Sequence, residues 1–265
     1  MPLVNAAAGG KRSCVEALLA AGALPNAFSG DWPPLAWAAR RGHTGCVEAL
    51  LAGSADPNQL DADGWTALHQ ATSNGAACMP ALLAAGADPL AIETVGKRTP
   101  LHWATHYGEA EAMQHLLEAA PEAAALKDRQ GDTPLALALL GPHDDEVALL
   151  VLEKGSLQPA EEVLALIHEI ETHLGTFDPL YAPYVARQPL TPHQWELIHT
   201  DCPVLAAALP AVLRRSTVEA GLLVHRLPPE HQARLRTAAL CLGRMCVPAL
   251  PTPLMWHLLA LSVTP

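Results

Sequence analysis

A block of nine residues returns along this chain at an interval of 33 residues, and this recurrence restricts the fold more than any other feature. Residues 63–71 read DGWTALHQA and residues 96–104 read GKRTPLHWA. The same frame appears one period earlier at residues 32–39, and one period later, shifted by 34, at residues 131–138. Such a period is typical of a stacked repeat protein, in which each unit buries its apolar faces against its neighbours.

A second apolar segment with helical spacing precedes or follows each block. It reads CVEALL at residues 14–19 and again at 46–51, MPALL at 79–83 and MQHLL at 113–117. The Thr that opens a block is a helix N-cap, and the Pro after it has no amide to lose at the first helical position. The paired Leu of the second segment faces the neighbouring units. The pattern therefore predicts pairs of short helices joined by turns.

These blocks resemble the ankyrin repeat, whose signature is TPLHxA followed by a second helix and a GADxN turn. Residues 99–104 (TPLHWA) match the signature in full, residues 66–69 (TALH) depart at one place, and residues 133–136 (TPLA) lack the His. The resemblance covers about residues 3–155 and implies an all-α solenoid of helix pairs with short hairpin loops. It implies five repeats, the first truncated, and that His69 and His102 brace the hairpin backbone.

The chain beyond the repeats is expected to be an α-helical C-terminal region. We predict an ankyrin-repeat domain at 1–155, a capping helix at 156–175, a Pro-rich linker at 176–191 and a helical region at 192–265. Capping boxes at residues 191–194 (TPHQ) and 216–219 (STVE) mark two of its helix starts. A long helix is expected from Pro228 to about Val247.

The C-terminal residues also show a weak resemblance to an adaptor motif. Residues 242–250 follow the spacing LxxxCxxxL of the elongin-binding part of a SOCS box, and the LPTPL that follows resembles its cullin-contacting part or the start of an F-box. The resemblance implies that the array selects substrates for a ubiquitin ligase, with adaptor contacts at Leu242, Cys246, Leu250 and Pro251. The two SOCS-box elements overlap here, whereas the family separates them, so an ordinary terminal helix hairpin is the alternative.

Charge and composition narrow the classes of partner. The formal net charge is −11, and Lys and Arg occur in no run longer than a pair, so a nucleic-acid partner is not expected. No secretory signal or spanning apolar stretch is visible, which predicts a cytoplasmic or nuclear protein without membrane insertion. We therefore expect a partner protein whose identity, like the oligomeric state, the sequence leaves open.

Tryptophan and arginine side chains are the candidate contacts for that partner. Trp37, Gln70 and Trp103 each follow the signature His position by one residue, on the expected concave side of the first helices. Trp32, Trp65 and Arg98 precede the blocks at the hairpin tips. Trp and Arg often carry the binding energy of interfaces. The expected partner-binding residues are Trp32, Trp37, Arg40, Trp65, Gln70, Arg98, Trp103, His106 and Tyr107. The alternative is that each ring only packs on its neighbouring repeat.

The remaining chemistry-bearing residues have structural interpretations. His102 and His106 are four residues apart on one helix, but no third metal ligand joins them at a suitable spacing. Cys14 and Cys46 share one repeat position and Cys78 falls close to it, which predicts small core residues. We therefore expect no metal, no cofactor and no enzymatic activity. A catalytic C-terminal domain would require a polar pocket lined by His193, His199 and Asp201.

Overall fold

The computed structural model describes residues 2–28, 30, 32–140, 145–155, 161–165, 167, 181–198, 202–233 and 235. Every regular element in these residues is a helix, and none of these helices combines the length and apolar character needed to cross a bilayer. The chain divides into two compact units, residues 1–156 and 157–265.

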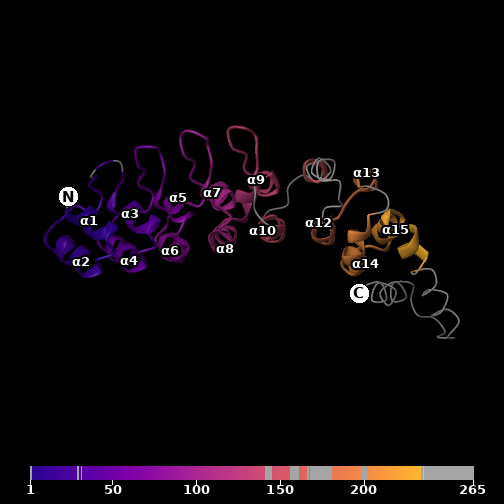
Figure 1. Cartoon of the computed structure of the whole chain (residues 1–265), viewed down its shortest axis with the longest axis horizontal. Helices are drawn as coiled ribbons and strands as arrows, with labels where there is room; N and C mark the ends of the chain where they lie inside the picture. Colours follow the sequence, from indigo (N-terminus) through magenta and orange to yellow (C-terminus); the bar gives the residue numbers. More distant parts are fainter. Residues whose placement is uncertain are drawn as a thin grey trace, which may run out of the picture. The chain divides into compact units, whose positions relative to one another are not determined.

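The first unit is a stack of five helix pairs, drawn from indigo to rose in Figure 1. One row holds the first helix of each pair: α1 (Pro2–Ala8), α3 (Pro34–Arg40), α5 (Ala67–Ala71), α7 (Pro100–Tyr107) and α9 (Pro134–Leu140). The other row holds the second helices: α2 (Arg12–Ala20), α4 (Thr44–Ala52), α6 (Met79–Ala84), α8 (Ala110–Ala119) and α10 (Asp145–Lys154). Short 3-10 turns at Ala76–Cys78 and Pro121–Ala125 accompany α6 and α8. The predicted all-α stack is confirmed.

Each helix row packs along its own length, so the core runs the whole length of the stack. Helix α3 packs on α1 and α5, and α4 packs on α2 and α6. The Leu that follows Thr-Pro or Thr-Ala in the repeat is buried each time, at Leu68, Leu101 and Leu135. Because a single pair leaves two apolar faces open, each pair depends on its neighbours for burial.

Hairpin loops project from the first helix row (Figure 1), and those at residues 53–66, 85–99 and 126–133 are here called fingers. Asparagine links neighbouring loops below their tips: Asn58 Oδ1 accepts from the Asp88 amide at 2.7 Å, and its Nδ2 donates to the Gly86 carbonyl at 2.9 Å. Asn26 Oδ1 accepts from the Asp56 amide in the same way. These side chains satisfy turn amides that no helix uses, and they hold successive fingers in one register.

The cysteines follow the predicted core position except at the first repeat. Cys46 and Cys78 are 1% and 0% exposed, as expected. Cys14 is exposed, so the prediction that it is a core residue was wrong. The physical reason is that α2 packs on α4, which carries Cys46, whereas none of the described helices packs on the equivalent side of α2.

The second unit contains α12 (Tyr181–Arg187), α13 (Pro192–Glu196), α14 (Leu209–Arg215) and α15 (Thr217–Arg226), with a 3-10 turn at Pro203–Ala208. Its core includes Tyr184, Trp195 and Leu223. Burial raises the pKa of the Tyr184 hydroxyl, which donates to Gln188 Oε1 at 2.8 Å.

Residues 181–187 correct the prediction of a Pro-rich linker at 176–191, because they form helix α12. Pro183 lies in the first turn of that helix, where its missing amide removes no intrahelical hydrogen bond. Burial of Tyr184 and Val185 then favours the helix over an extended chain.

The two predicted capping boxes differ in the structure. Thr191 and Gln194 form both reciprocal hydrogen bonds, at 3.3 and 2.9 Å. Ser216 accepts from the Glu219 amide at 3.2 Å, but the Glu219 carboxylate instead accepts from Arg215 at 2.7 Å and from the Leu190 amide. Most of the predicted capping helix at 156–175 and of the helix at 228–247 lies outside the described residues.

Candidate functional site: a tryptophan groove beside the fingers

A carboxylate closes each finger by accepting the amides of the turn that follows it. Asp61 Oδ1 accepts from the amides of Asp63 and Trp65, at 3.0 and 2.8 Å. Asp128 Oδ1 accepts from Gln130 and Asp132 in the same way. Both aspartates are buried, each with 7% of the residue exposed, so these hydrogen bonds compensate the carboxylates for lost hydration.

The middle finger uses Glu93 where its neighbours use Asp. Glu93 accepts from the amides of Val95 and Gly96 at 2.6 Å and from that of Arg98 at 3.3 Å. Thr99 follows Glu93 by six residues, whereas Thr66 follows Asp61 by five. The longer side chain therefore spans a turn that is one residue longer.

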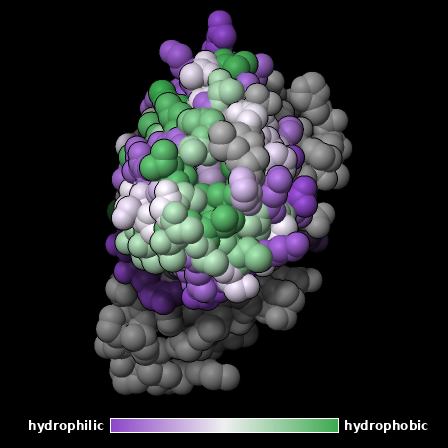
Figure 2. Space-filling model, turned by 90° about the vertical axis from the view of Figure 1, so that its left-hand side faces the viewer, coloured by the Kyte–Doolittle hydropathy of each residue, from purple (hydrophilic) through white to green (hydrophobic). Residues whose placement is uncertain are grey.

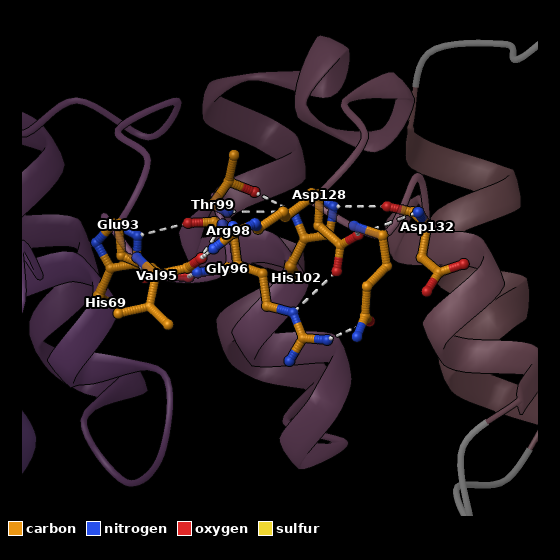
Figure 3. Close-up of polar contacts among 11 residues, drawn as sticks. His69, Glu93, Val95, Gly96, Arg98, Thr99, His102, Asp128 and Asp132 are labelled. Carbon is orange, nitrogen blue, oxygen red and sulfur yellow. Dashed lines mark hydrogen bonds and ion pairs between the residues drawn. The ribbon is translucent and has the colours of Figure 1, made fainter.

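Histidines at the signature position tie each finger to the next one (Figure 3). His69 Nδ1 accepts from the Thr66 amide at 3.2 Å, so the ring proton is on Nε2, which donates to the Arg98 carbonyl at 3.1 Å. His102 repeats the arrangement between the Thr99 amide and the Asp132 carbonyl. The prediction that these imidazoles brace the hairpin backbone is confirmed. Both ring nitrogens are thereby occupied.

Burial keeps these imidazoles neutral. It lowers the pKa of His69 to about 4, although the hydrogen bond to Arg98 acts in the opposite direction. Burial likewise lowers the pKa of His102. A second ring proton would also displace the Thr amide from Nδ1, so the neutral form is the one that fits the finger base.

A buried ion pair joins the last two fingers. Arg98 Nε donates to Asp128 Oδ2 at 3.0 Å, and the two side chains are 19% and 1% exposed. Burial raises the pKa of Asp128, but the hydrogen bond from Arg98 and the turn amides outweigh it, and the net pKa is lowered. The carboxylate therefore stays ionised, and it binds Arg98 of the middle finger as well as the turn amides of its own finger.

Between the fingers and the first helix row lies a hollow of about 590 Å³, here called the tryptophan groove. Its walls come from repeats two to five. Six of the nine predicted partner-binding residues line it: Trp32, Arg40, Trp65, Gln70, Arg98 and Trp103. Asp63, which the sequence suggests as part of the polar surround of these contacts, also lines it. Sequence reasoning missed the remaining lining residues, which are Glu93, Val95, Gly96, Asp128, Arg129 and Gln130. The sequence does hold a signal for the acids that close the fingers. An acidic residue lies five or six positions before the Thr of each block, at Asp61, Glu93 and Asp128.

The tryptophans form two aromatic clusters along this face. Trp32 and Trp37 lie 4.6 Å apart between ring centroids, and Trp65 and Trp103 lie at the same separation across two repeats. Arg40 lies over Trp32 at 4.9 Å and Arg98 over Trp103 at 5.3 Å. Such cation–π contacts hold the guanidinium groups against the rings.

Trp103 lies where it could contact a partner and also packs on the neighbouring repeat, so both interpretations of the tryptophans apply to it. It lines the groove, yet it packs on Trp65 in the neighbouring repeat and stacks on Tyr107 at 5.9 Å. Its indole Nε1 is enclosed and has no hydrogen-bond acceptor in the structure. His106 and Tyr107 adjoin this ring without lining the groove, as Trp37 adjoins Trp32.

Gln70 is 3% exposed, so it supports the groove from below. Its side-chain amide nitrogen, Nε2, donates to Asp61 Oδ2 at 2.9 Å, and its Oε1 accepts from Arg40 at 3.1 Å. The predicted role of Gln70 as an exposed contact residue needs correction, because both ends of its amide are already bonded. Its effect is to hold the exposed Arg40 in place.

Several predicted residues lie outside the described part of the chain. These are the adaptor residues Leu242, Cys246, Leu250 and Pro251, together with His199 and Asp201 of the hypothetical catalytic pocket. His193 is described and lies exposed on α13.

The stacked helix pairs, inter-finger hydrogen bonds and buried signature residues define a helical repeat protein. The family model described as ankyrin repeats (3 copies) matches residues 3–93 and again residues 78–160. This chain belongs to the ankyrin-repeat family. Ankyrin repeats are generally protein–protein interaction modules, and proteins built from them are typically scaffolds without enzymatic activity.

Proposed function

We propose that this protein binds a partner protein through the tryptophan groove and the adjoining finger tips. The observation that carries the proposal is that half-buried indoles from successive repeats line one hollow of about 590 Å³. Large aromatic side chains on a rigid scaffold contribute contact area with little loss of conformational entropy. A hollow that crosses several repeats suits an extended segment of the partner.

The charged side chains of the groove that keep unused hydrogen-bonding groups indicate which side chains the partner segment carries. Glu93 and Asp128 are saturated by turn amides and by Arg98, so their charges are not available. Arg40 and Arg129 are exposed and keep unused guanidinium donors. We propose that an apolar or aromatic side chain of the partner packs on the indoles, and that a carboxylate of the partner pairs with Arg40.

A matched pair of tryptophan variants tests this proposal. Peptides enriched from a phage-displayed random library on the wild-type chain would be measured by fluorescence anisotropy. We expect Trp32→Ala to weaken binding by at least about tenfold, because Trp32 lines the groove. Trp37→Ala is the control, since its ring is also half-buried and adjoins Trp32 but does not line the groove.

The affinity of the control variant should stay within about threefold of the wild type, the range of energetically neutral contacts. Arg40→Ala should selectively weaken those peptides that carry a carboxylate. If the enriched peptides bind Trp32→Ala as tightly as the wild type, the groove is not the recognition surface.

A further inference from the structure

Three of the four tryptophans in the first unit carry an arginine of this chain over the indole ring. The pairs and their distances to the ring centroid are Arg40–Trp32 at 4.9 Å, Arg41–Trp37 at 5.5 Å and Arg98–Trp103 at 5.3 Å. Trp65 is the fourth, and it is half-buried and lines the tryptophan groove. Among the residues that the structure describes, no arginine or lysine lies over the ring of Trp65.

The two rings that contact Trp65 do not replace the missing cation. Trp103 lies at 4.6 Å between ring centroids and is uncharged. His69 lies at 5.8 Å, and burial keeps it neutral by lowering its pKa to about 4. The face of an indole attracts a cation. The part of Trp65 that lines the groove is therefore open to a cation from another molecule.

Asp63 supplies a negative charge two residues before this ring. Three acids line the groove, but turn amides saturate Glu93, and Asp128 is paired with Arg98. Asp63 is exposed, and its carboxylate has no hydrogen-bond or ion-pair partner in the described part of the chain. It is therefore the lining acid that can still pair with a cation.

The turn of the finger fixes Asp63 and Trp65 relative to each other. A single oxygen, Asp61 Oδ1, accepts from both of their amides, at 3.0 and 2.8 Å. The Asp63 carbonyl accepts from Thr94 Oγ1 of the next finger at 2.7 Å. Because this backbone is already held in place, binding at the two side chains costs little further ordering.

We propose that Trp65 and Asp63 bind an arginine side chain of the partner protein. The inference rests on the proposed function and specifies one residue of the bound segment. A planar guanidinium can stack on an indole and pair with a carboxylate at the same time, whereas a lysine ammonium is a compact point charge. Figure 2 views the stack from its first repeat, and hydrophilic surface adjoins apolar surface at the upper end, where the fingers project. Such a surface suits a segment with both charged and apolar side chains.

Peptides enriched on the wild-type chain test this inference when each is made again with citrulline in place of arginine. Citrulline keeps the shape of arginine and removes its charge. We expect arginine in the enriched peptides and at least about tenfold weaker binding of their citrulline forms in fluorescence anisotropy. Asp63→Asn should weaken the arginine forms by at least about fivefold and change the citrulline forms by less than about twofold, because the two changes remove one and the same ion pair.

Glu111→Gln is the matched control, because it removes one negative charge from an exposed residue of α8 that does not line the groove. It should leave every affinity within about twofold of the wild type, since salt screens charges outside the contact.

Three outcomes would overturn the inference and leave the proposed function intact. The enriched peptides could depend on Trp32 yet lack arginine, could bind Asp63→Asn as tightly as the wild type, or could keep their affinity when lysine replaces arginine. Peptides that bind Trp32→Ala as tightly as the wild type would overturn both.

Discussion

Replacing Asp128 with Ala is expected to lower the free energy of unfolding of the repeat stack by about 3–5 kcal/mol. The substitution leaves the guanidinium of Arg98, which is only 19% exposed, without its carboxylate. It also removes the acceptor for the amides of Gln130 and Asp132. The cost is large because buried charges and amides lose their partners without gaining water.

Glu118→Ala is the control for this measurement. Glu118 pairs with Lys154 at 2.7 Å, a shorter distance than in the Arg98–Asp128 pair, but its side chain is 54% exposed. Exposed ion pairs contribute about 1 kcal/mol or less. We therefore expect Asp128→Ala to lower the free energy of unfolding more than Glu118→Ala does, because the first pair is buried, although the charges of the second pair are closer.

Urea denaturation followed by far-UV circular dichroism would give both free energies. Because repeat stability is a sum over neighbours, Asp128→Ala should loosen the last repeats first and can broaden the transition. Equal effects of the two substitutions would contradict the role assigned to the buried pair.

The second large effect is a loss of stability in mild acid. His69 has a pKa of about 4 in the folded chain, because burial disfavours its charged form, and about 6.5 when unfolded. Below pH 6.5 the unfolded state binds a proton that the folded state does not, so stability falls as the pH falls. Above about pH 6.5 His69 leaves the free energy of unfolding unchanged. Between about pH 6.5 and about pH 4 it lowers that free energy progressively as the pH falls.

At pH 5 the loss from His69 alone is about 2 kcal/mol. His102 adds to it in the same direction, since its pKa is also lowered by burial. The physical event is protonation of Nδ1, which breaks its hydrogen bond with the Thr amide at the base of the finger.

Urea midpoints measured between about pH 7.5 and pH 5 would test this dependence. His69→Gln should lower stability at neutral pH but reduce the pH slope, because the titrating imidazole is gone. A slope that is unaffected in His69→Gln would assign the acid sensitivity to other groups.

Periodicity alone was sufficient to predict the stack of helix pairs, because each repeat carries its own caps and its own apolar faces. Thr66 and Thr99 mark helix starts, and Leu68 and Leu101 mark the buried positions, from local patterns only. The bracing role of His69 and His102 also followed from the resemblance to the family. Local signals failed at residues 181–187, where burial of Tyr184 and Val185 favours a helix in a Pro-rich segment.

The groove itself depends on contacts between residues about one repeat apart. Gln70 and Trp37 hold equivalent places in the repeat, yet Gln70 is buried beneath Arg40 while Trp37 packs on Trp32 outside the groove. The segment CVEALLA occurs at residues 14–20 and again at residues 46–52. The side chains of the second copy are mostly buried and those of the first are mostly exposed, although the two sequences are identical. The sequence by itself determined which faces are apolar and where the helices begin. Only the tertiary structure decided which faces are covered, because exposure depends on the neighbouring repeat.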